Sequence, residues 1–153
     1  MLPSTTARVM EQTPDYINDR IREKTEASVV RFAIAGPEAI RQRLAELDRE
    51  WDIERFLEVN ASVVVLTGLA LGLVRDRRWL IVPILASGFL LQHALQGWCP
   101  PVPILRRLGI RTSAEIEHER YALKALRGDF QHLEVPSQSD RELARQTLQA
   151  VQT

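Results

Sequence analysis

The sequence has almost no cysteine and no excess of charge of either sign. Cys99 is the only cysteine among the 153 residues, which excludes an internal disulfide and a paired-cysteine redox or metal site. Twenty lysine and arginine residues balance twenty acidic ones, so the chain lacks the net positive charge of a general nucleic-acid-binding protein. We therefore expect no nucleic-acid partner.

Sequence motifs for common cofactors and catalytic sites are also missing. There is no Gly-x-Ser-x-Gly nucleophile elbow, no phosphate-binding loop and no dinucleotide-binding fingerprint. Glu115 and His118 form a single Glu-x-x-His pair, whereas di-iron carboxylate bundles use two such pairs. Unless a dimer supplies the second pair, we expect Glu115, His118 and Glu119 to lie on a solvated helix face. The prediction is no cofactor and no metal.

Two long uncharged runs occupy the middle of the chain. The N-terminal segment MLPSTTARVMEQTPDY has no apolar region of the kind that a cleaved signal peptide needs, so any membrane insertion must come from these runs. The first covers residues 59–74. Extended backwards past Glu58 by Phe56 and Leu57, it approaches the roughly 20 residues that cross a bilayer core. The second covers residues 79–105, and the tetrad Arg75-Asp76-Arg77-Arg78 separates the two. A soluble chain of this length would lack the shell to bury two such helices, which predicts a transmembrane hairpin with the lipid bilayer as partner.

Helical patterns precede this hairpin. Residues 14–34 and 37–56 each begin with a proline at a first-turn position, and Ala35-Gly36 separates them. The second segment is amphipathic, so it either lies in the headgroup region or packs on a partner helix. Its apolar residues at helical spacing are Ile40, Leu44, Leu47 and Trp51.

Further helices are predicted after the hairpin. Ser113 can cap a helix that stops at Gly128, and Ser139 with Glu142 forms a capping box for a last helix. The predicted fold class is therefore all-α: a two-helix transmembrane hairpin with amphipathic cytoplasmic helices before and after it. Its parts are N-terminal helices at residues 1–55, the hairpin with a GWCPP exit turn at 56–108, and C-terminal helices at 109–153.

Arginine and lysine residues predict the orientation of the hairpin. The loop between the two runs has three arginines, whereas the flanks of the hairpin carry nine basic residues. Since basic residues favour the cytoplasmic side, we expect both termini in the cytoplasm. The nine are Arg41, Arg43, Arg49, Arg55, Arg106, Arg107, Arg111, Arg120 and Lys124.

Small and aromatic residues mark the two runs further. Gly68 and Gly72 form a Gly-x-x-x-Gly pair, a pattern that allows close packing of membrane helices, although glycine is also simply common in such helices. Trp79 and Trp98 are of the type that anchors a helix at the headgroup level. The candidate packing glycines are Gly68, Gly72, Gly88 and Gly97.

His93 is the ionisable residue inside the second run. A titratable group at membrane depth is a functional candidate by default, and we expect it to face the bundle interior with Gln92, Gln96 or Thr67 as partner. A neutral, hydrogen-bonded histidine near the interface is the alternative.

Cys99 lies at the expected end of the second helix. Pro100 and Pro101 push the preceding residues out of the helical region, so the helix should end near Trp98. A helix C-terminus disfavours a thiolate unless cations such as Arg106 and Arg107 fold back onto it. Cys99 is either a small residue buried in a tight exit turn or a working thiol.

The sequence resembles the YgaP-like transmembrane domain family, a bacterial domain of unknown function. The resemblance lies in the hairpin, in Gly97, Cys99 and Pro100 after it, and in LRRLGIRT at residues 105–112. The resemblance covers residues 56–112. It implies an inner-membrane hairpin that can dimerise and that is sometimes fused behind a cytoplasmic rhodanese domain. The cysteine-free N-terminal part of this chain has no rhodanese active-site loop.

Three functions remain open from the sequence. The first is a non-enzymatic anchor of the bacterial inner membrane that self-associates or docks on a protein partner, through the amphipathic N-terminal helix and through a tail face formed by Ile116, Leu123, Leu126 and Phe130. The second is a sulfur relay in which Cys99 takes sulfur from a cytoplasmic sulfurtransferase, with Arg106 and Arg107 stabilising the anion. The third, a small solute path past His93, requires oligomerisation because two short helices cannot enclose a pore.

Overall fold

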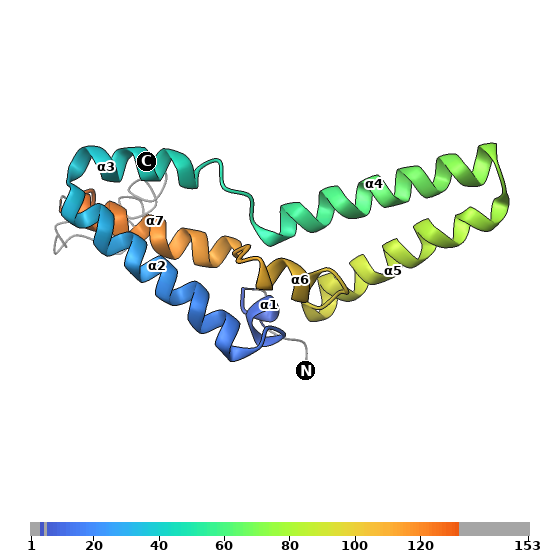
Figure 1. The fold of residues 1–153 in the computed structure, drawn as a ribbon, viewed down its shortest axis with the longest axis horizontal. Coiled ribbons are helices and arrows are strands. Elements are labelled where there is room, and N and C mark those ends of the chain that lie inside the picture. The colour runs from blue at the N-terminus through green and yellow to red at the C-terminus, as the bar shows by residue number, and fades with distance from the viewer. Residues whose placement is uncertain (1–3, 5, 132–153) are drawn as a thin grey trace, which may run out of the picture.

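The computed structural model describes residue 4 and residues 6–131, and every regular element in that part of the chain is a helix (Figure 1). The helix predicted from Ser139 and Glu142 lies outside the described residues. The elements are α1 (Arg8–Glu11), α2 (Asp15–Ala35), α3 (Pro37–Leu47), α4 (Ile53–Val74), the 3-10 helix η1 (Arg77–Leu80), α5 (Ile81–Gln96), α6 (Val102–Arg107) and α7 (Ser113–Arg127).

Helices α4 and α5 pack against each other and project as a long arm from the rest of the molecule (Figure 1). Asp52 caps α4 by accepting a hydrogen bond from the Arg55 amide at 2.8 Å, a favourable N-cap for a residue type that accepts locally. At the far end of the arm, η1 turns the chain back, and Asp76 accepts from the Arg78 amide at 2.8 Å. The two helices therefore run in opposite directions.

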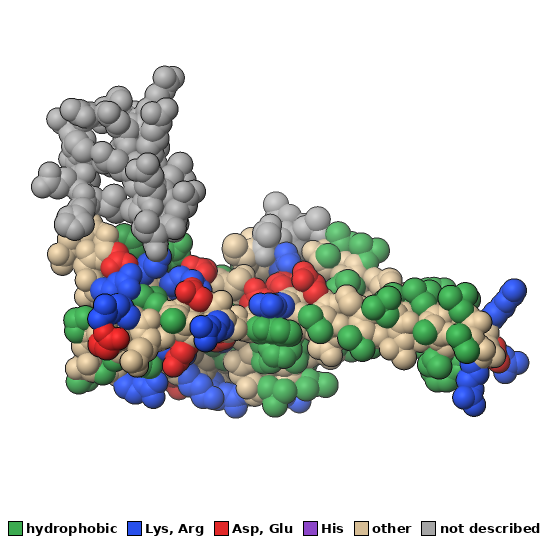
Figure 2. Space-filling model, turned by 90° about the horizontal axis from the view of Figure 1, so that it is seen from above, with side chains coloured by type: hydrophobic (Ala, Val, Ile, Leu, Met, Phe, Trp, Pro, Cys, Tyr) green, Lys and Arg blue, Asp and Glu red, His purple; other side chains and the backbone are tan. Residues whose placement is uncertain are grey.

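The arm is apolar on its outside. Ile53–Val74 and Arg77–Gln96 are each long and apolar enough to cross a membrane, and only 17% and 11% of their most apolar windows are buried within the chain. Figure 2 shows apolar side chains along the surface of the arm and arginine side chains at its tip. Exposed apolar side chains over two whole helices are unusual for a soluble monomer.

The other end of the molecule is a helical head formed by α2, α3 and α7, which contact one another pairwise. Its core consists of Ile40, Leu44, Leu47, Ile116 and Leu123, against which Val29 and Phe32 pack. These include three residues of the amphipathic N-terminal face and two residues of the tail face. Of the two alternatives for the amphipathic helix, packing on another helix is the one observed, and these five side chains are used inside the chain rather than on a partner protein.

A second small core, the joining core, packs α1 and α6 against the base of the arm. It contains Val9 of α1, Ile53 and Leu57 of α4, Cys99, and Val102 of α6. Residues that are far apart in the sequence thus meet at the base of the arm. The packing of this core fixes the position of Cys99 relative to both apolar helices.

The predicted helix over residues 37–56 is interrupted. Helix α3 ends at Leu47 and α4 begins at Ile53, so the predicted continuous helix is wrong. The Ile53 amide donates to the Arg111 carbonyl at 2.9 Å, and the Glu50 carboxylate accepts from the Arg111 guanidinium. These contacts to a distant segment outweigh local helical propensity, which is a weak preference.

The second uncharged run also divides into shorter elements. It contains the end of η1, then α5, and then most of α6, with Gly97 in the left-handed conformation at φ 77° as the C-cap of α5. The expected stop near Trp98 is close to the observed end at Gln96. At α7, the capping residue is Thr112 rather than Ser113, since Thr112 and Glu115 form a complete capping box.

Candidate functional site

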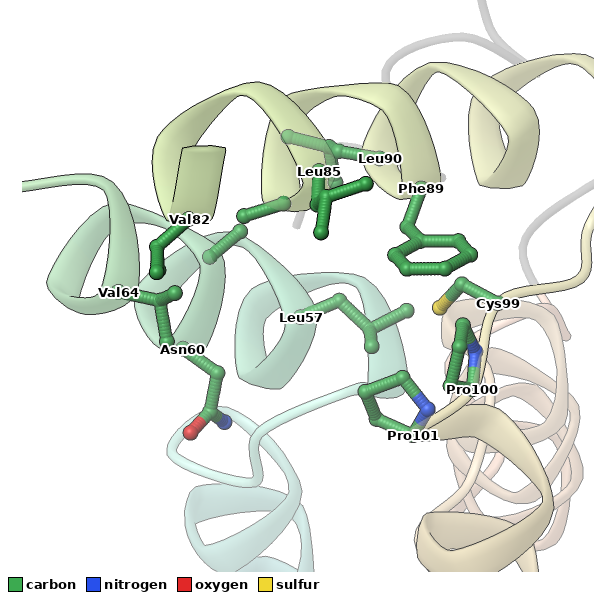
Figure 3. Close-up of a pocket in the computed structure, with 12 residues that line it drawn as sticks. Leu57, Asn60, Val64, Val82, Leu85, Phe89, Leu90, Cys99, Pro100 and Pro101 are labelled. Carbon is green, nitrogen blue, oxygen red and sulfur yellow. The ribbon is translucent and has the colours of Figure 1, made fainter. Parts of the chain in front are cut away.

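Cys99 lies in the turn between α5 and α6, at the base of the arm. Only 3% of its surface is exposed, and its sulfur points into a pocket between α4 and α5 (Figure 3). The left-handed Gly97 turns the chain directly after α5, which a residue without a side chain does at little cost. This turn brings Cys99 back against the helix that precedes it.

His93 lies one turn before the end of α5 and is 2% exposed. Its Nε2 is 2.7 Å from the Glu54 Oε2, and the Cys99 side chain lies close enough to influence the ring electrostatically. The buried Nδ1 makes no hydrogen bond. The imidazole is therefore paired with a carboxylate through one nitrogen and has a second, unpaired nitrogen, and its partner is Glu54 rather than the expected Gln92, Gln96 or Thr67.

Glu54 is a site residue that the sequence reasoning missed. It occupies the first turn of α4, just before the uncharged run. Antiparallel helices place the start of the first beside the end of the second, so a carboxylate at residue 54 and a histidine at residue 93 become neighbours. The sequence signal that could have identified the pair was the position of Glu54 just before the first uncharged run and of His93 near the end of the second helix.

Helix α1 covers this group of residues. The Arg8 guanidinium donates to the second oxygen of Glu54 at 2.9 Å, and Val9 is buried against Cys99 and Leu57 in the joining core. A Cβ at Gly97 would lie 2.4 Å from the Arg8 carbonyl oxygen. The N-terminal segment is therefore packed directly onto the turn that carries the thiol.

Glu54, His93 and Cys99 are the residue types of an activated nucleophile, and the base–orienter pair of Glu54 and His93 is formed. A base within hydrogen-bonding reach of a thiol, itself oriented by a third group, is the general signature of such sites. When the hydrogen on Nε2 is donated to the Glu54 carboxylate, Nδ1 carries the lone pair that can accept the thiol proton. The three side chains can thus generate a thiolate paired with the imidazolium of His93, without help from an arginine.

The pocket beside the thiol is apolar and has a volume of about 360 Å³ (Figure 3). It opens between the two apolar helices, and apart from Cys99 its only polar lining side chain is Asn60. The other lining residues are Leu57, Ala61, Val64, Val82, Leu85, Ala86, Phe89, Leu90, Pro100 and Pro101. Such a lining favours an apolar ligand.

Arg106 and Arg107 do not have the role that the sequence suggested. The buried Arg106 donates to both Glu115 oxygens, at 2.6 and 2.7 Å, and is thus committed to a bidentate pair. Arg107 has an exposed side chain, and its carbonyl accepts a hydrogen bond from Arg20 at 2.7 Å. The histidine, rather than either arginine, is the partner available to the thiol.

The head contains a second charged cluster, centred on the fully buried Glu119. Its carboxylate accepts hydrogen bonds from Arg43, Arg111 and Ser28 at 2.6–3.1 Å. The expected solvated face of Glu115, His118 and Glu119 is therefore wrong for Glu119, and also for Glu115, which binds Arg106. His118 is exposed, as expected. In the part of the chain that the structure describes, no group of three or more His, Cys, Asp or Glu residues could hold a metal ion.

This cluster makes stability sensitive to acid. Burial raises the pKa of Glu119, but hydrogen bonds from Arg43, Ser28 and Arg111 outweigh it and hold that pKa below its ordinary value. A carboxyl with a lower pKa in the folded state loses its stabilising contribution as pH falls through that pKa. We expect the free energy of unfolding of the chain in detergent to fall below about pH 5. Glu119→Gln, which cannot ionise, should be less stable than the wild type at pH 7, and its free energy of unfolding should fall less steeply with acid. An equally steep fall in both proteins would contradict this role of Glu119.

The other predicted residues are spread along the arm. Gly68 and Gly72 face α5 and η1, since a Cβ would lie 2.6 Å from Pro83 Cδ and 2.5 Å from Leu80 Cδ2, respectively. Gly88 has no neighbour within 4 Å of a Cβ, so it does not contribute to this contact. Trp79 in η1 is exposed and Trp98 is half-buried, at opposite ends of α5.

Comparisons with known proteins do not assign this site. No protein-family model, curated protein or solved structure matches the chain. The function therefore has to be argued from the arrangement of its own residues.

Proposed function

We propose that this chain is a non-enzymatic anchor and interaction protein of the bacterial inner membrane. In this proposal α4 and α5 span the bilayer as a hairpin, and the head of α2, α3 and α7 lies in the cytoplasm. The observation that carries it is that both apolar segments of the arm are mostly exposed, since only 17% and 11% of their most apolar windows are buried in the chain. A helix that is apolar all round requires either a large protein shell or lipid.

The polar residues of the arm support this placement. The exposed Arg75, Asp76, Arg77 and Arg78 gather at its tip, where they would lie in water on the opposite side of the bilayer. At its base, the Glu54 carboxylate pairs with both Arg8 and His93, as expected of partly buried polar groups near a membrane. Between these two ends the arm offers lipid an apolar surface.

Exposed apolar side chains on the head and on the arm supply the surface for interaction with a partner. Tyr16, Val30 and Ile34 on α2 are more than half exposed, although the expected amphipathic face of α3 is used internally. On the arm, exposed valine and leucine side chains on α4 could meet those of a second copy in the membrane. Self-association through the arm agrees with the dimerisation implied by the resemblance to the YgaP-like family.

Site-directed labelling tests the proposed topology. In a Cys99→Ser background, Arg77→Cys at the tip should react with an impermeant maleimide in intact cells, whereas Gln42→Cys in the head should react only after the membrane is opened. Arg77 and Gln42 are both exposed polar residues, so the two cysteine variants differ only in where the new thiol is located. Extraction of the protein by alkaline carbonate, or the reverse labelling pattern, would contradict the proposal.

A second candidate function, thiol chemistry at Cys99, is favoured by one specific observation. His93 is placed beside the thiol and is oriented by Glu54. In the sulfur-relay form of this candidate, a cytoplasmic sulfurtransferase would hand sulfur to Cys99, with His93 taking the part that the sequence suggested for Arg106 and Arg107. The reactivity of the thiol decides between this candidate and a purely structural cysteine.

A further inference from the structure

The thiol and the apolar pocket belong to one site. The Cys99 sulfur points into the space between α4 and α5, where Leu57, Phe89 and the two prolines surround it (Figure 3). The nearby His93 is 2% exposed, and its Nδ1 makes no hydrogen bond. Cys99 therefore has a candidate base, His93, close to it and faces an apolar space of about 360 Å³.

We propose that Cys99 is an acyl acceptor, which takes a fatty acyl group from an acyl thioester and holds its hydrocarbon chain in the pocket between α4 and α5. This inference rests on the second candidate function, a reactive Cys99, and it names the class of group that the thiol receives. Juxtamembrane cysteines are common attachment sites for fatty acyl chains.

The chemistry of the lining selects an acyl chain over a polar group. A persulfide or other sulfane donor needs hydrogen-bond donors and cations near the transferred sulfur, and the pocket lining supplies one amide, Asn60, and no charged side chain. Burying a polar group without partners is unfavourable, whereas methylene groups gain free energy from the same surface. In the proposed topology the base of the arm lies near the headgroups, which is the level of the carbonyl end of an acyl chain.

The shape of the pocket accommodates such a chain. It lies between two helices that lipid would surround, and it is open on one side, so a chain longer than the pocket can continue into the bilayer. Small side chains at Ala61 and Ala86 leave the space in front of the thiol open. A larger side chain at either position would reduce the length of acyl chain that the pocket can hold.

The transfer balances without an oxidant or reductant. The Cys99 proton passes to His93, and the sulfur attacks the carbonyl carbon of the donor thioester. The carbon–sulfur bond to Cys99 forms, the carbon–sulfur bond of the donor breaks, and the departing thiolate takes the proton back from His93. Glu54 orients the imidazole throughout and is a positioning residue.

The first experiment measures acylation of the full-length chain in detergent micelles. Hexadecanoyl-coenzyme A is added, and the intact mass is followed with time. We expect one hydroxylamine-sensitive acyl group on the wild type and none on Cys99→Ser. His93→Gln should slow the reaction about a hundredfold. The pH profile of the rate should change in Glu54→Gln, which a merely structural role would not cause. A wild-type rate no greater than that of the urea-unfolded chain, which has the same single thiol, would overturn the proposal.

A pair of pocket variants separates the acyl site from simple thiol reactivity. Ala86→Phe fills the pocket, whereas Ala94→Phe adds the same ring at an exposed position on the same helix. Ala86→Phe should lower the rate with the hexadecanoyl donor about tenfold or more and leave the rate with an acetyl donor and with N-ethylmaleimide nearly unchanged. Equal effects on long and short donors would overturn the acyl site while leaving a reactive thiol. If Cys99 does not react with maleimide, both the second candidate function and this inference are overturned.

Discussion

Replacement of Arg106 by methionine is expected to lower the free energy of unfolding by about 3–5 kcal/mol, the range for breaking a buried ion pair. The guanidinium has no exposed surface and makes hydrogen bonds to four residues: Thr13, Asn18, Ile110 and Glu115. Methionine keeps the approximate length of the side chain but makes none of these bonds. The carboxylate of Glu115, which is 15% exposed, is then left without its cation.

The reason for this large effect is that Arg106 connects three parts of the fold. Thr13 and Asn18 lie at the junction of α1 and α2, and Glu115 lies in the first turn of α7. The Thr13 hydroxyl also donates to the Val9 carbonyl at 2.7 Å, so the position of α1 depends on the same group. Loss of the guanidinium should therefore loosen the head and the N-terminal cover together.

Arg107→Met provides the matched control for this prediction. It removes the same charge from the adjacent residue, but the Arg107 side chain is exposed, and its bond to Arg20 uses the main-chain carbonyl, which survives the change. Its expected effect is within about 0.5 kcal/mol. Urea unfolding in detergent micelles, followed by far-ultraviolet circular dichroism, measures both. Equal losses would show that Arg106 acts only through net charge.

Rescue of Arg106→Met tests the ion pair itself. In the double variant Arg106→Met with Glu115→Leu, neither charge is buried unpaired, and apolar replacements of buried pairs are often close to neutral. We expect the double variant to recover a substantial part of the lost stability. A double variant less stable than Arg106→Met would mean that Glu115 stabilises the fold mainly through its capping bond to Thr112.

Replacement of Gly97 by alanine is expected to have the second large effect, about 1–3 kcal/mol of lost stability. Gly97 has φ 77°, which a residue with a side chain adopts only at a cost. A Cβ there would also lie 2.4 Å from the Arg8 carbonyl oxygen and 2.5 Å from its carbonyl carbon. Because those atoms are backbone, α1 would have to move away from the turn.

Displacement of α1 has a chemical consequence that can be measured separately. Arg8 would lose its place beside Glu54, and Val9 would no longer cover Cys99. We therefore expect Gly97→Ala to react faster with N-ethylmaleimide at Cys99 than the wild type, in addition to unfolding at a lower urea concentration. Both effects follow from the same backbone contact.

Gly88→Ala is the control for Gly97→Ala. Gly88 lies inside α5, has no positive φ, and has no neighbour within 4 Å of a Cβ. Alanine in a helix interior is more favourable than glycine by about 0.5–1 kcal/mol, so this variant should be at least as stable as the wild type and equally reactive at Cys99. A similar loss in both variants would contradict the specific role of the Gly97 turn.

Much of the helical architecture could be predicted from the residues alone. Breaks at Gly36, near residues 75–78, after Gln96 and at Gly128 follow from glycine, proline and charge in the sequence, because these residue types act locally on the backbone. The interruption after Leu47 could not be predicted, because it depends on the Arg111 carbonyl and guanidinium, which lie far along the chain. For the same reason, partners were assigned wrongly to His93 and to Arg106.

The sequence by itself determined that this protein is helical and that two of its helices are apolar enough to cross a membrane, since length and hydropathy are properties of a continuous segment. It also singled out Cys99 and His93, because they are the titratable residues of a long uncharged run. Only the tertiary structure decided which charges pair and which surfaces remain free. Antiparallel packing brings Glu54 to His93, and the left-handed turn at Gly97 brings Cys99 to the same ring. The Glu54–His93 contact joins residues 39 positions apart, so no local pattern encodes it.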